Sequence, residues 1–167
     1  MPGEGQVFYQ TPEDQEEFKD QALLQAEAVC QRRGARLTRL RRRVLEILWN
    51  ENRPVGAYYI LDILRDERKG AAPPTVYRVL DFLVEQGLAH RIERLNAFLG
   101  CRTPDQPHTA QFMICKVCGL VAELHNEEID HAVHVAASEV DFTADISTIE
   151  IEGVCPKCRE AGKGLAE

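Results

Sequence analysis

The sequence predicts an α+β protein made of two successive modules, a helical half that ends in a β-hairpin and a smaller mixed half held by a metal ion. Three observations lead to this prediction. Apolar residues recur at helical spacing in four segments before residue 88, and short strand-like segments follow. Basic residues are concentrated in the middle of the chain. Four cysteines of the second half form two C-x-x-C pairs.

The helical half can be followed element by element. The expected helices span about Pro12–Arg33, from Thr38 onward, Ala57–Arg65, and Pro73 to Gly87. Thr38 is a good N-cap, and proline is tolerated in a first turn. Gly34 stands where the first helix would stop, and Cys30 lies in its apolar stripe, which favours a core thiol over a ligand.

Two short strand-like runs, Leu88–Glu93 and Ala97–Cys101, follow the helices with a turn between them. Helices followed by a hairpin form the outline of a winged helix-turn-helix. In that fold the helix before the hairpin enters the major groove of double-stranded DNA by its N-terminal residues. Thr75, Tyr77 and Arg78 occupy that position, and arginine can bridge guanine O6 and N7.

The charge distribution favours the same partner. The net charge is −7, but residues 31–94 hold fourteen basic and eight acidic residues, a net of +6. Seven arginines and no acid lie between Arg32 and Arg43, around the start of the second helix. Such a cluster, including Arg36 and Arg42, is well placed to meet DNA phosphates. The alternative interpretation is that these arginines form a solvent-exposed surface without a binding partner.

The second half begins with predicted strands at Gln111–Cys115 and Gly119–Leu124. Asn126 is expected to cap a helix that runs to about Val140, and Ile146–Glu152 alternates as a strand does. The helix should bury a stripe of apolar residues, namely Ile129, Val133, Ala136 and Val140. The predicted organisation is therefore a flexible tail (1–12), a winged-helix domain (13–101), a hinge (102–110), a metal-binding domain (111–158) and a second flexible tail (159–167).

The paired cysteines, Cys115 with Cys118 and Cys155 with Cys158, suit one tetrahedral structural zinc ion. A thioredoxin-like redox pair or unligated core thiols are the competing interpretations. The duplication of the motif, with Gly119 and Pro156 as turn-formers, argues against both. The 36 residues between the pairs indicate that the metal holds a small domain together rather than a finger.

A second cluster lies where the two halves meet: His90, Cys101, His108 and Glu123. One sulfur, two imidazoles and a carboxylate form a good tetrahedral set for zinc. Each residue also has an ordinary interpretation as a surface, buried or solvated side chain. The expected cofactor is thus Zn²⁺, about two ions per subunit.

Several motifs resemble the ferric uptake regulator family. They are Arg36-Leu-Thr38, Pro73-Pro-Thr-Val-Tyr-Arg78 and the two C-x-x-C pairs. The order of His90, Cys101 and Asp-Gln-Pro-His108 is most similar to the zinc uptake regulator branch. The likeness covers roughly residues 22–158.

The resemblance implies a homodimeric, metal-dependent transcriptional repressor of zinc-uptake genes, with a C-terminal α/β dimerisation domain. It implies structural zinc at the four paired cysteines and regulatory zinc at the interdomain hinge, on His90, Cys101, His108 and Glu123. DNA contacts would fall on Tyr77 and Arg78, with Tyr58 on the preceding helix. Family members often have Arg-x-Thr-Pro-Gln-Arg where this chain has a more basic run that begins at Arg36 and includes Thr38. The first region expected to contact DNA therefore differs from the usual family pattern.

These features set the expected partners and location. We expect a palindromic, AT-rich DNA operator and no small-molecule substrate. No apolar run approaches the roughly 20 residues of a membrane helix, and the first 20 residues are polar and acidic, which argues against a signal peptide. A cytoplasmic protein without a membrane partner is the expectation, with its thiols reduced.

Three alternatives remain at this point. Another metal or peroxide sensor of the same family is one of them. A zinc hydrolase or a thiol oxidoreductase is the second, although a catalytic zinc keeps a position open for water and the junction cluster already offers four ligands. The third is a zinc-binding interaction module that does not bind DNA.

Overall fold

The chain forms two units, which are described separately: one within Gln10–Gln106 and one within Pro107–Glu167. The computed structural model describes residues 14–51, 53–67, 71–101, 104, 109–124, 126–144 and 147–163, with side chains from residue 21. His108 and Ile146 lie outside the described residues. Within the described part, no helix is both long and apolar enough to cross a membrane.

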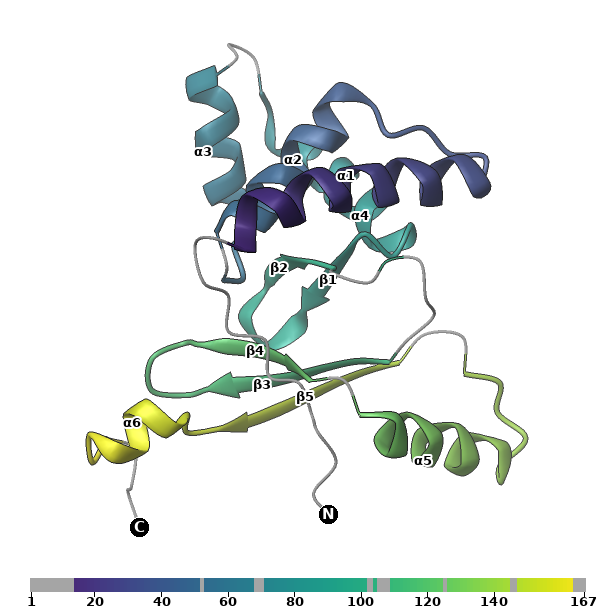
Figure 1. The fold of residues 1–167 in the computed structure, drawn as a ribbon, viewed down its shortest axis with the longest axis vertical. Coiled ribbons are helices and arrows are strands. Elements are labelled where there is room, and N and C mark those ends of the chain that lie inside the picture. The colour runs from purple at the N-terminus through teal and green to yellow at the C-terminus, as the bar shows by residue number, and fades with distance from the viewer. Residues whose placement is uncertain are drawn as a thin grey trace. The chain divides into compact units, whose positions relative to one another are not determined.

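Helices and a hairpin make up the N-terminal unit (Figure 1). The helices are α1 (Asp14–Arg32), α2 (Arg39–Asn50), α3 (Ala57–Glu67) and α4 (Pro73–Glu85). Thr38 caps α2, because its side-chain oxygen accepts a hydrogen bond from the backbone N–H of Arg41 at 3.5 Å. Gly34 has φ of 65°, so the chain turns after α1 where the sequence predicted a stop.

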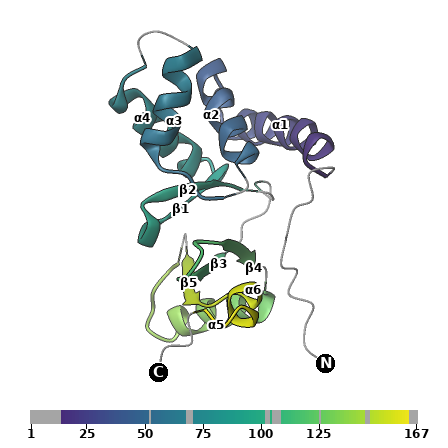
Figure 2. The same ribbon diagram turned by 90° about the vertical axis from the view of Figure 1, so that its left-hand side faces the viewer.

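One apolar stripe of each helix faces a common core. Figure 2 shows the arrangement of helices α1 to α4 that surround it. The central side chains are almost fully buried: Ala26, Val29, Val44, Leu45, Leu48, Ile60, Leu61, Leu64, Val76, Leu80 and Leu83. Each leucine or isoleucine of this set contributes about 1.5–3 kcal/mol by leaving water. Cys30 is 1% exposed within the same core, which confirms its interpretation as a core thiol.

The hairpin consists of β1 (Ala89–Ile92) and β2 (Ala97–Gly100), which pair antiparallel with His90 opposite Leu99. A short 3-10 turn, η1 (Glu93–Leu95), joins the strands, and Asn96 closes it at φ of 45°. The segment between α2 and α3 also joins the hairpin, because Val55 and Phe98 exchange two backbone hydrogen bonds of 2.9 Å. Helices closed by this hairpin form the predicted winged-helix arrangement.

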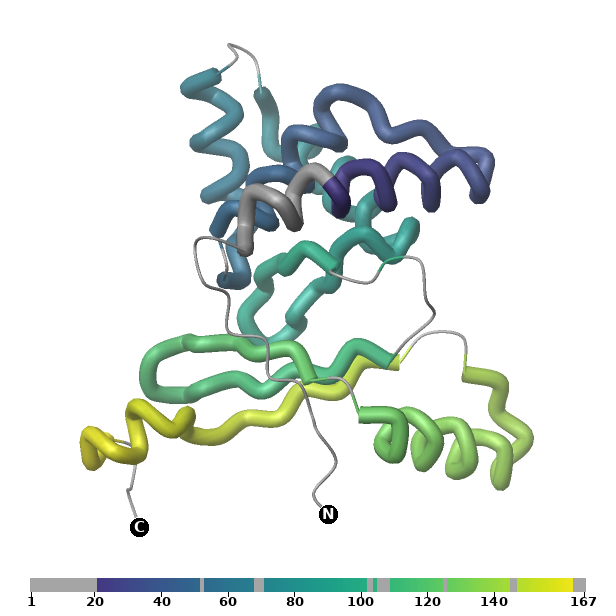
Figure 3. The backbone as a smooth tube through the Cα atoms, viewed as in Figure 1, coloured from purple at the N-terminus to yellow at the C-terminus, as the bar shows by residue number. Residues whose placement is uncertain are grey.

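The C-terminal unit is built on a three-stranded sheet in the order β4-β3-β5 (Figure 3). Strand β3 (Ala110–Cys115) pairs antiparallel with β4 (Val121–Leu124) and parallel with β5 (Thr148–Gly153). Helix α5 (Glu127–Ser138) connects β4 to β5, and Asn126 caps it by accepting from two backbone N–H groups, as predicted. Strand β3 lies in the centre and buries Phe112 completely.

Two expectations for this unit differ from the structure. The prediction of a buried stripe on α5 is wrong for the single chain, because no side chain of α5 is buried and Val140 beyond it is 74% exposed. The apolar spacing is present, but the described residues leave this face only partly covered. A short helix, α6 (Pro156–Glu160), also extends two residues into the segment expected to be a tail.

Candidate metal centre and nucleic-acid interface

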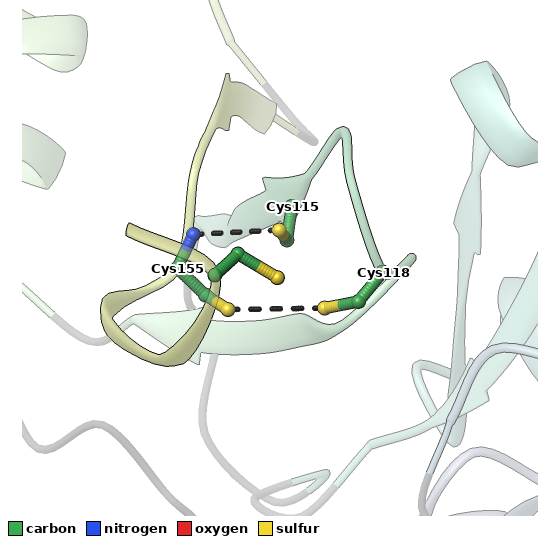
Figure 4. Close-up of side chains that lie close together, drawn as sticks. Cys115, Cys118 and Cys155 are labelled. Atoms are coloured by element: carbon green, nitrogen blue, oxygen red, sulfur yellow. Dashed lines mark hydrogen bonds between the residues drawn. The ribbon is translucent and has the colours of Figure 1, made fainter. Parts of the chain in front are cut away.

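The four paired cysteines converge at one end of the C-terminal sheet. Their sulfur atoms all lie within 4.8 Å of one another, and the Sγ atoms of Cys118 and Cys155 are 3.7 Å apart. Figure 4 shows Cys115, Cys118 and Cys155 approaching one another from two separate segments. All six cysteines of the chain are free thiols. The predicted four-thiol cluster is therefore assembled in the structure.

Local backbone chemistry places these thiols. Cys115 ends β3, and Gly119, at φ of 73°, donates its N–H to the Cys115 carbonyl at 2.9 Å to close the first turn. Cys155 is the N-cap of α6, with Pro156 at the first helical position. The parallel pairing of β5 with β3 brings the second turn alongside the first, because Lys116 N–H donates to the Gly153 carbonyl at 2.9 Å.

The electrostatics of the cluster favour a bound cation. Backbone N–H groups, that of Cys155 first at 3.3 Å from the sulfur, lower the pKa of Cys115 to about 6. Burial and hydrogen bonds with the other thiols raise the pKa of Cys158 to about 12. Four thiols this close cannot all ionise unless a positive ion neutralises them.

The geometry fits zinc. A tetrahedral Zn–S distance of about 2.3 Å requires sulfur atoms about 3.8 Å apart. The Cys118 and Cys155 sulfur atoms are 3.7 Å apart, and the four sulfur atoms all lie within 4.8 Å of one another. Four thiolates complete the coordination shell and leave no position for water, which is the arrangement of a structural site rather than a catalytic one.

The second predicted metal set is divided between the units. In the hairpin, the alternation of the strands places His90 and Cys101 on one face, and Cys101 is fully buried. The backbone of Cys101 is held on both sides, since its N–H donates to the Leu88 carbonyl at 2.9 Å and its carbonyl accepts from the Trp49 indole at 3.3 Å. Glu123 lies half-buried on β4, in the other unit. That these residues share a metal with His108 stays a prediction.

The exposed start of α4 is the candidate DNA-reading surface. Val76, Val79, Leu80 and Leu83 point into the core, which leaves Thr75, Tyr77 and Arg78 exposed. Tyr58, on α3, is 65% exposed although it is large and partly apolar. These are the side chains that the sequence placed at the interface, and each is accessible to a partner.

The arginine cluster is not uniform. Arg42 lies 3.3 Å from Glu27 and 3.7 Å from Glu46, and Arg43 bonds to Glu67 through two nitrogen atoms. Four other arginines are exposed and have no acidic partner among the described residues: Arg32, Arg33, Arg36 and Arg39. Arg43 and Arg42 precede Glu46 by three and four residues, so pairing with Glu46 could be expected from the sequence. The pairings with Glu27 and Glu67 depend on how the helices pack.

Comparison with known proteins gives concordant matches. The sequence model of the ferric uptake regulator family matches residues 32–152. The zinc uptake regulation protein of Escherichia coli (strain K12) is 41% identical over 139 residues, which cover 83% of this chain and 81% of that protein. A solved zinc uptake regulator in complex with zinc and DNA is similar with a TM-score of 0.78 and 39% identity, covering 86% of this chain and 97% of the other. Holo XcZur gives a TM-score of 0.74 and 36% identity, over 84% and 99% of the two chains.

Proposed function

Because this chain belongs to the ferric uptake regulator family, we propose that it is a zinc-responsive, DNA-binding transcriptional repressor of zinc-uptake genes. It is a transcription regulator and not an enzyme. One observation carries this function most directly. A winged-helix unit with exposed Thr75, Tyr77 and Arg78 occurs in a chain that is 39% identical to a regulator solved with zinc and DNA.

Zinc has two roles in this proposal. The first ion would be held by Cys115, Cys118, Cys155 and Cys158, and would stabilise the C-terminal unit. The second would be bound by His90, Cys101, His108 and Glu123, and would act as the regulatory metal. Cys101 supports the assignment to zinc, since a soft thiolate ligand suits zinc better than ferrous iron.

The proposed regulatory ligands come from both units and from the hinge expected at residues 102–110. Binding one ion to all of them would restrict how the DNA-reading unit is oriented. The ratio of the DNA-binding conformation to the inactive one rises from 1:99 to 99:1 only if the metal ion binds the first conformation about 5.5 kcal/mol more tightly than the second. A metal ion that binds only one conformation tightly can supply this free energy.

We further propose that the protein acts as a homodimer on a palindromic, AT-rich operator. A two-fold dimer presents two recognition helices to half-sites about one helical turn apart. The uncovered apolar side chains of α5, together with Phe142, which is 65% exposed, support a second copy as the covering partner. The cytoplasm is the proposed location, because it keeps zinc-binding thiols reduced.

The test is a zinc titration of DNA affinity. A duplex enriched from a random library by the zinc-loaded protein is labelled, and its binding is followed by fluorescence anisotropy in zinc-buffered solutions. Zinc should strengthen binding, whereas manganese and ferrous ions at the same free concentration should not. Binding that does not depend on zinc would contradict the proposed function.

The regulatory ligand set is tested separately with Cys101→Ser. This variant should retain one zinc ion per chain and lose zinc-dependent DNA affinity. If its zinc-dependent affinity is undiminished, the proposed regulatory set is wrong even though the protein remains a repressor.

A further inference from the structure

Arg41 differs from the other arginines of the cluster because its guanidinium packs on an aromatic ring. It belongs to α2, yet its guanidinium carbon lies 3.4 Å from the ring centroid of Phe82, on α4. Its Nη1 also donates a hydrogen bond of 2.6 Å to the backbone carbonyl of Arg36. Neither contact involves an acidic residue, so this guanidinium is held by an aromatic face and a carbonyl oxygen.

These contacts connect the two places where DNA contact is proposed. Arg36 and Thr38 form the segment before α2, and the Thr38 N–H donates to the same Arg36 carbonyl at 3.1 Å. Phe82 lies on α4 four residues after Arg78, and residues at this spacing are neighbours on a helix surface. Arg41 therefore bridges the segment before α2 and the side of α4 that carries Arg78.

The chemistry of these contacts is specific to arginine. The planar guanidinium can lie flat on an aromatic ring while a nitrogen at its edge donates to a carbonyl. A lysine ammonium carries the same charge but cannot stack in this way. Because Arg41 is already engaged by protein groups, it is less suited to a phosphate than the exposed Arg39 of the same helix.

We propose that Arg41 is a positioning residue for DNA recognition, which fixes the Arg36–Thr38 segment against α4 without itself contacting a phosphate. This inference rests on the proposed function, in which α4 reads the major groove. Loss of the bridge would let the two contact regions move independently and would weaken binding without removing a phosphate contact.

The salt dependence of DNA binding separates positioning from phosphate contact. Each lost phosphate contact reduces the slope of log affinity against log salt by about one. Arg41→Ala should weaken zinc-dependent binding roughly tenfold and leave this slope unchanged. Arg39→Ala is the matched comparison, and its slope should fall by about one. Arg41→Lys should behave like Arg41→Ala, since charge alone does not restore stacking.

A double-mutant cycle gives a second measurement. Phe82→Leu keeps an apolar side chain on α4 and removes the ring, so it should weaken DNA binding as Arg41→Lys does. Combining the two changes should cost little more than either alone. These milder variants keep the test available if Arg41→Ala does not fold.

Two results would overturn the inference. One is a slope that falls by about one in Arg41→Ala and recovers in Arg41→Lys, which would identify Arg41 as a phosphate contact. The other is full additivity of the Arg41 and Phe82 effects. Both results are compared with the zinc-dependent DNA binding of the wild-type protein. If the proposed function is wrong, the wild-type protein itself will not bind DNA, and the two failures can be told apart.

Discussion

The substitution Gly100→Ala should strongly destabilise the N-terminal unit. A Cβ atom at Gly100 would lie 2.5 Å from Cδ1 and 2.6 Å from Nε1 of Trp49, far inside van der Waals contact. Trp49 is only 5% exposed, so its rigid ring has little room to move. Overpacking of this kind costs about 1–3 kcal/mol. Displacing the indole also endangers its hydrogen bond to the Cys101 carbonyl, worth about 1 kcal/mol.

The expected total is a loss of about 2–4 kcal/mol, or at least about 8 °C in the melting temperature of a unit of this size. Trp49 is the single tryptophan of the chain, so its emission reports on this unit alone. Urea unfolding followed by tryptophan fluorescence measures the free energy of unfolding. A shift of the native emission spectrum would show that the ring has moved.

Gly56→Ala is the matched control, because no atom beyond Gly56 and its two chain neighbours lies within 4 Å of a Cβ built there. It should change the stability by less than about 0.5 kcal/mol. In a Trp49→Leu background, followed by circular dichroism, Gly100→Ala should cost much less than in the wild type. The reasoning is refuted if Gly100→Ala is as stable as Gly56→Ala, or if its cost is the same without the indole.

Three further outcomes are expected. Cys158→Ser should lower the bound zinc by one ion per chain and unfold the C-terminal unit, because structural zinc contributes on the order of 10 kcal/mol to the free energy of folding. Trp49 emission, which reports on the N-terminal unit, should stay native. Full retention of zinc would contradict this expectation. Thr38→Ala should cost about 1 kcal/mol in thermal unfolding through loss of a helix cap, and Thr38→Ser should restore it. The hydrogen bond from Arg43 lowers the pKa of Glu67. This pair therefore stabilises the fold above the ordinary value of 4.5, and the stabilisation is lost as pH falls from there through the lowered pKa of the folded state. The stability difference between wild type and Glu67→Gln should therefore be present at pH 7 and vanish in acid, and a difference that persists there would exclude the ion pair as its cause.

Helix ends were predictable because their chemistry is local. Thr38 and Asn126 cap the helices that the sequence assigned to them, since a side-chain oxygen reaches a backbone N–H only two or three residues away. The orientation of Thr75, Tyr77 and Arg78 was predictable for a similar reason. Once the apolar residues of one helix face are known, the opposite face follows from the helical period.

Helix α5 shows where this kind of prediction ends. Its apolar spacing indicates that one face avoids water, but spacing does not say what covers that face. The structure leaves Val140, the last residue of the predicted stripe, 74% exposed and buries no residue of the helix. Spacing alone cannot supply this information, because a face that a second copy would cover looks the same in sequence as a face that the chain covers itself.

Which arginines of the cluster are paired could be learned only from the tertiary structure, for a different reason. Counting charges along the chain gave seven arginines and no acid between Arg32 and Arg43, but not which of them pair with acids elsewhere in the chain. Glu27 and Glu67 pair with Arg42 and Arg43 because helix packing brings them together, and Arg41 turns onto Phe82 for the same reason. Side chains separated by 15 to 41 positions meet only after the bundle forms, so no local pattern could divide the cluster.

The sequence by itself determined the ligand chemistry of the metal centre: four thiols, in two turns that Gly119 and Pro156 allow the backbone to make. Only the tertiary structure decided that the two turns meet. The parallel pairing of β3 with β5 aligns Cys115 with Gly153 and so brings Cys155 within hydrogen-bonding distance of the Cys115 sulfur, across a separation of 40 residues. A turn depends on a few neighbouring dihedral angles, whereas this convergence depends on the register of strands distant in sequence, which the packed sheet establishes.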